Sequence, residues 1–109
     1  MSGMSAEHVI IMSTTDSEES ALALASGAVE AGLGACAQIV GPITSVFRWD
    51  GAVQTEREWR VEVKTAGDRA QALIEHLEAN HGYDVPEVVT VPVTGGSVAY
   101  LSWVADETR

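Results

Sequence analysis

Three histidines, His8, His76 and His81, are the side chains best suited to bind a transition metal. His76 and His81 are five residues apart, which on a helix separates them by about 140° around the axis, so they cannot share one ion. His81 could instead pair with Asp84 or Glu87 in the loop that follows it. A transition-metal site needs three or four converging ligands, so this pattern predicts at best a site of low specificity. The alternative interpretation is that His81 caps the end of a helix.

The single cysteine, Cys36, is a poor candidate nucleophile. It has no histidine near it in the sequence, and its small apolar neighbours are typical of a buried hydrophobe rather than a reactive thiol. The chain contains no GxSxG, no HExxH and no Walker-type phosphate loop. The sequence therefore favours a protein that is not an enzyme and needs no organic cofactor.

Lys64 allows two interpretations at the end of a predicted strand. It either solvates the outer face, with Glu62 as a partner, or anchors an anionic ligand between subunits. Two aromatic residues near the end of the chain, Tyr100 and Trp103, are better explained by packing than by stacking on a ligand.

The charge of the chain excludes several classes of partner. Six Lys and Arg residues against 16 Asp and Glu residues give a net charge of −10. Nucleic acids and anionic membranes both require clustered basic residues, so we expect neither as a partner. The first residues, MSGMSAEH, lack the pattern of a secretory signal, and no apolar run approaches the ~20 residues of a membrane span. Together with the single cysteine, these features predict a cytoplasmic location.

The first part of the chain predicts a strand followed by a helix. We expect residues 1–7 to form a flexible tail and residues 8–109 to form a single domain. The apolar run over 8–13 predicts a central strand. The spacing of apolar residues over 17–33 predicts a helix, with Asp16 as its N-cap.

A long hairpin occupies the centre of the sequence. Its first strand runs over 36–49, is interrupted at Gly41-Pro42 and ends at an Asp-Gly turn, and its second strand alternates over 53–65. The first strand would be about 45 Å long, whereas the preceding helix would be about 25 Å long. The hairpin must therefore be covered by something other than that helix.

The remaining segments complete a two-layer fold. We predict a helix over 69–80 with Asp68 as its N-cap, a strand over 88–93 and a terminal helix over 99–106. The order β-α-β-β-α-β plus a terminal helix predicts an α+β, ferredoxin-like sandwich with both crossover helices on one face of an antiparallel sheet.

The other face of that sheet lacks helices of its own. Exposed there, Trp59, Val61 or Val63 would form an apolar patch, and the hairpin arms would present free edges. We therefore predict a closed homo-oligomer, assembled through sheet faces and hairpin edges.

Several stretches together resemble the CutA, or divalent-cation tolerance, family. They are GACAQIVGPITSVFRWDGAVQTEREW, EVKT, HGYDVPEVVTVPVTGG and YLSWV, in the family's order and spacing between Val9 and Val104. The resemblance implies a ferredoxin-like homotrimer in the cytoplasm, an architecture like that of the PII signal-transduction proteins, and a role in tolerance to divalent cations, copper among them.

The resemblance also implies candidate site residues. Met12 stands where some members have a cysteine proposed as a copper ligand, and His81 keeps one of two histidines found in such members. Cys36 matches a cysteine of the family, so a copper site could use His81 with Met12 or Cys36. Seven further residues match family positions that we interpret as lining the cleft between subunits: Trp49, Glu58, Lys64, Tyr83, Glu87, Tyr100 and Trp103.

The leading hypothesis is thus a trimeric, metal-responsive tolerance protein that binds Cu(II) or another divalent cation. The alternatives are a PII-like sensor that binds an anionic small molecule in the inter-subunit cleft near Lys64, and a structural trimer that scaffolds other proteins.

Overall fold

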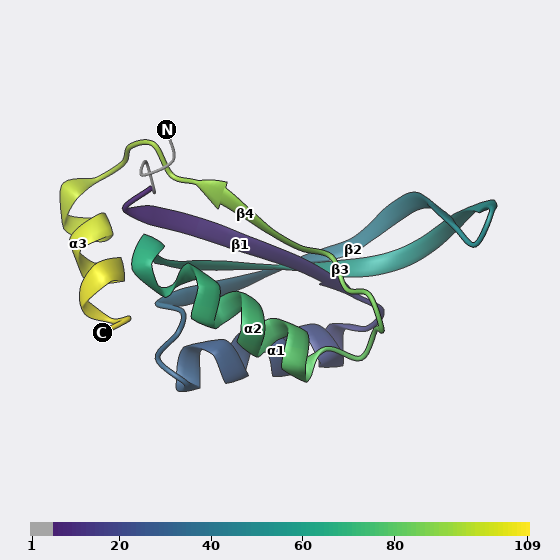
Figure 1. The fold of residues 1–109 in the computed structure, drawn as a ribbon, viewed down its shortest axis with the longest axis horizontal. Coiled ribbons are helices and arrows are strands. Elements are labelled where there is room, and N and C mark those ends of the chain that lie inside the picture. The colour runs from purple at the N-terminus through teal and green to yellow at the C-terminus, as the bar shows by residue number, and fades with distance from the viewer. Residues whose placement is uncertain (1–5) are drawn as a thin grey trace.

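The structure is a computed structural model and describes residues 6–109. One antiparallel sheet contains four strands in the order β2-β3-β1-β4: β1 (His8–Thr15), β2 (Cys36–Trp49), β3 (Ala52–Ala66) and β4 (Val88–Pro92). Helices α1 (Glu18–Glu30) and α2 (Ala70–Asn80) lie on one face, and α3 (Val98–Asp106) lies at one end of the sheet (Figure 1). The predicted α+β class, the order of the elements and the antiparallel sheet are confirmed.

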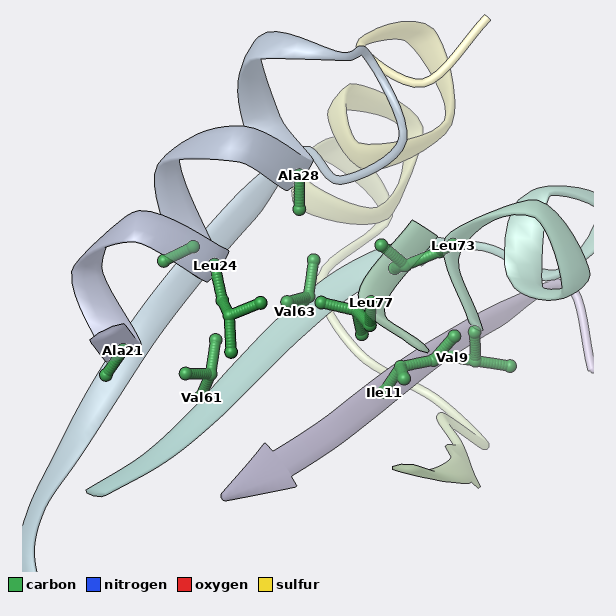
Figure 2. Packing of buried hydrophobic residues seen from close by; sticks show 10 residues of the cluster. Val9, Ile11, Ala21, Leu24, Ala28, Val61, Val63, Leu73 and Leu77 are labelled. Atoms are coloured by element: carbon green, nitrogen blue, oxygen red, sulfur yellow. The ribbon is translucent and has the colours of Figure 1, made fainter. Parts of the chain in front are cut away.

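The core lies between the sheet and the two crossover helices (Figure 2). Leu24 of α1 faces Val61 and Val63 of β3, whereas Leu73 and Leu77 of α2 lie over β1. Alternation along β3 places Val61 and Val63 on this covered face, where neither side chain is exposed to solvent.

The expectation of Trp59, Val61 or Val63 on the uncovered face is therefore wrong. Trp59 has the same parity as the two valines, and it packs partly buried against the core. The helix-free face instead carries the other register positions of β3, which are Glu58, Arg60, Glu62 and Lys64. The helices cover the more apolar set of side chains because its burial contributes more free energy.

Two predicted helix caps are also wrong. Ser17, rather than Asp16, caps α1, since its hydroxyl oxygen accepts a hydrogen bond from Ser20 N at 3.0 Å. Asp68 belongs to a 3-10 turn (Gly67–Arg69) before α2, and its carboxylate accepts bonds of 2.7 and 2.9 Å from the Arg109 guanidinium. A cation 41 residues away thus binds the carboxylate that local sequence assigned to a cap.

The hairpin of β2 and β3 projects beyond the helices, as predicted (Figure 1). Asp50 and Gly51 have φ angles of 53° and 82°, the left-handed conformation that a two-residue turn of this type requires. A register shift between Val40 and Ile43 marks the predicted interruption at Gly41-Pro42. Strand β2 has 14 residues and so spans about 45 Å, whereas the 13 residues of α1 span only about 20 Å.

Residues 1–5 of the tail predicted over 1–7 lie outside the described residues. The next two are held in place, since Ala6 packs against the core and Glu7 O accepts a hydrogen bond of 2.8 Å from Gly67 N. Within residues 6–109, no helix is long and apolar enough to cross a membrane.

Candidate functional site

A cavity of about 710 Å³ opens between the projecting hairpin and the segment that follows α2. We call it the hairpin cavity. One wall is the hairpin, and the other consists of residues 83–87 with Thr14 and Asp16 at the end of β1. Its volume falls within the ~300–1,000 Å³ typical of small-molecule sites.

The hairpin wall follows from the pairing register of its two strands. Ser45 pairs with Glu56, and Phe47 pairs with Gln54. Directly opposed residues share a face of an antiparallel pair, so Glu58, two residues from Glu56, lies on this face as well. Trp49, two residues beyond Phe47, extends the wall to the turn and is 52% exposed.

His81 fixes the opposite wall. Its Nε2 donates a hydrogen bond of 2.8 Å to the carbonyl oxygen of Thr14, and its Nδ1 accepts one of 3.0 Å from Tyr83 N. A carbonyl only accepts and a backbone amide only donates, so the ring is the neutral tautomer with its proton on Nε2. His81 is the C-cap residue of α2, where its backbone N–H donates to Glu78 O at 3.5 Å, and its side chain connects the end of the helix to β1.

Tyr83 and Glu58 join the two walls. The Tyr83 hydroxyl donates a hydrogen bond of 2.9 Å to Glu58 Oε2, and Glu58 is only 8% exposed. Burial raises the pKa of Tyr83 above its ordinary value, and the hydrogen bond to Glu58 and the nearby charges of Glu58, Asp16 and Glu56 raise it further. The cavity thus holds a protonated phenol in a field of negative charge.

The seven predicted cleft residues form two separate groups within one chain. Four line the hairpin cavity: Trp49, Glu58, Tyr83 and Glu87. The others gather near α3, where Lys64 Nζ lies 6.0 Å from the centroid of the Tyr100 ring and donates to Gln38 Oε1 at 2.6 Å. The Tyr100 and Trp103 ring centroids are 5.6 Å apart. Lys64 is six residues from Glu58 along β3, a separation of about 20 Å.

The predicted metal ligands are also dispersed within one chain. Cys36 pairs across the sheet with Lys64, which pairs with Ile10, whereas His81 is bonded to Thr14. Ile10 and Thr14 are four positions apart along β1, a distance of about 13 Å. Met12 lies between them on β1. Within residues 6–109, no three or more His, Cys, Asp or Glu side chains are arranged to hold a metal ion.

Several lining residues were not predicted from the sequence as members of this site. Asp16 was interpreted as a cap, and Glu56 and Phe47 were interpreted only as strand residues. The period-two spacing of Phe47 with Trp49, and of Glu56 with Glu58, was a signal that could have placed them on one face.

Comparison with known proteins decides the family. A family model described as "CutA1 divalent ion tolerance protein" matches residues 9–107. This chain belongs to the CutA1 family. The Thermus thermophilus divalent-cation tolerance protein CutA is 38% identical over 99 residues, covering 91% of this CutA1 chain and 96% of that protein. The chloroplastic protein CutA of Arabidopsis thaliana is 42% identical over 101 residues, covering 93% of this chain but only 56% of that protein.

The fold of this CutA1 chain agrees with solved relatives. The crystal structure of CutA1 from Oryza sativa superposes with a TM-score of 0.91 at 39% identity and covers 96% of each chain. CutA1 from Thermus thermophilus superposes with a TM-score of 0.90 at 37% identity, covering 94% of this chain and 99% of that one. The chain spans just over half the length of the plant proteins CutA that it matches by sequence.

Proposed function

We propose that this CutA1 chain is a divalent-cation tolerance protein that works as a closed homotrimer of ferredoxin-like subunits in the cytoplasm. The observation that carries the proposal is the family match over residues 9–107. The single cysteine supports a reducing compartment, although two plant relatives are named chloroplastic and one archaeal relative is named periplasmic.

The projecting hairpin supports the assembly. Val46, Trp49 and Val53 are 67%, 52% and 63% exposed, and β2 is an edge strand. Large exposed apolar side chains beside an unpaired edge favour burial against another copy. Light scattering should give three times the chain mass of 11.5 kDa at every concentration tested. A monomer mass that does not change with concentration would exclude the trimer.

Copper is the predicted ion, with His81, Met12 and Cys36 as its candidate ligands. These residues do not form a coordination set within one chain, and both ring nitrogens of His81 are already hydrogen-bonded. Copper binding through His81 would therefore have to free one of these nitrogens and use ligands from more than one chain.

Isothermal titration with Cu(II) tests this part of the proposal. The His81→Ala variant should weaken binding at least about tenfold, because loss of one ligand from a small set is costly. The His76→Ala variant is the matched control, since His76 lies on α2 away from the hairpin cavity. Absence of copper binding, or equal affinity in both variants, would remove His81 from the metal site without affecting the trimer.

A further inference from the structure

We draw no further inference here: the strongest candidate, the helix-free face of the sheet where Val89 and Val91 of β4 are 43% and 39% exposed, is an unpartnered apolar face, and nothing in the described residues 6–109 shows what covers it.

Discussion

Replacement of Tyr83 by phenylalanine tests the link between the two walls of the hairpin cavity. The substitution removes one hydroxyl that donates to Glu58 Oε2 at 2.9 Å and leaves a carboxylate that is 8% exposed without this partner. A hydrogen bond to a charged group contributes about 1.5–3 kcal/mol. Tyr83 is only half-buried, so solvent replaces part of the lost bond. We expect the free energy of unfolding to fall by about 1–2 kcal/mol.

The same bond predicts a dependence of stability on pH. Burial, the bond to Glu58 and the surrounding acids raise the pKa of Tyr83 in the folded chain above its unfolded value of about 10. Above that value the unfolded chain releases a proton that the folded chain retains, so the free energy of unfolding decreases as pH rises. Below about pH 10 the contribution of Tyr83 is fully present. The Tyr83→Phe variant should lose this part of the alkaline decrease.

Denaturant unfolding at constant protein concentration measures both effects. The control is Tyr100→Phe, which removes the hydroxyl of the second tyrosine, located in α3. Phenolate absorbance provides a second readout, since one of the two tyrosines should ionise well above the ordinary range in the original chain. Equal stability of the two variants at neutral pH, with both tyrosines ionising near pH 10, would refute the argument.

Two further substitutions test how the hairpin and the core are packed. In Gly41→Ala, the new Cβ would lie 2.6 Å from Cδ1 of Trp59, so we expect a loss of about 1–3 kcal/mol in denaturant unfolding. Gly82→Ala is its control, since a Cβ at this position would have no atom within 4 Å apart from its chain neighbours. An equal loss of stability in Gly82→Ala would contradict the steric explanation. Leu77→Ala should reduce the melting temperature strongly, at a cost of about 2–5 kcal/mol, because the side chain is fully buried. Leu22 on α1 is 57% exposed, so Leu22→Ala should change the melting temperature little, and similar losses in both variants would disprove the assigned core.

The turn and strands of the hairpin could be predicted from the sequence, whereas two helix caps could not. The Asp50-Gly51 turn and the strand Cys36–Trp49 were predicted as observed, because alternation and turn chemistry act between neighbouring residues. The two predicted caps failed for different reasons: the adjacent Ser17 takes the place of Asp16 as N-cap, and Arg109, 41 residues away, binds the carboxylate of Asp68. Local propensity does not rank such competitors.

The fold class, the length of the hairpin and the resemblance to the family could all be read from the amino-acid sequence. The fold class and the hairpin length depend on periodicity and turn residues, and the family resemblance depends on short stretches in a fixed order; a linear chain displays all of these directly. The contacts of the candidate site residues, in contrast, could not be read from the sequence. In the fold, both ring nitrogens of His81 are hydrogen-bonded. Lys64 lies about 20 Å along β3 from Glu58.

The hairpin cavity shows the physical reason for this difference. Its walls are joined by a bond from His81 to Thr14, 67 residues apart, and by a bond from Tyr83 to Glu58, 25 residues apart. Side-chain patterns report on neighbours within a helical turn or a strand pleat. Contacts at such separations arise only when the crossovers bring β1, the hairpin and residues 83–87 together, so the cavity and its negative charge became visible only in the folded chain.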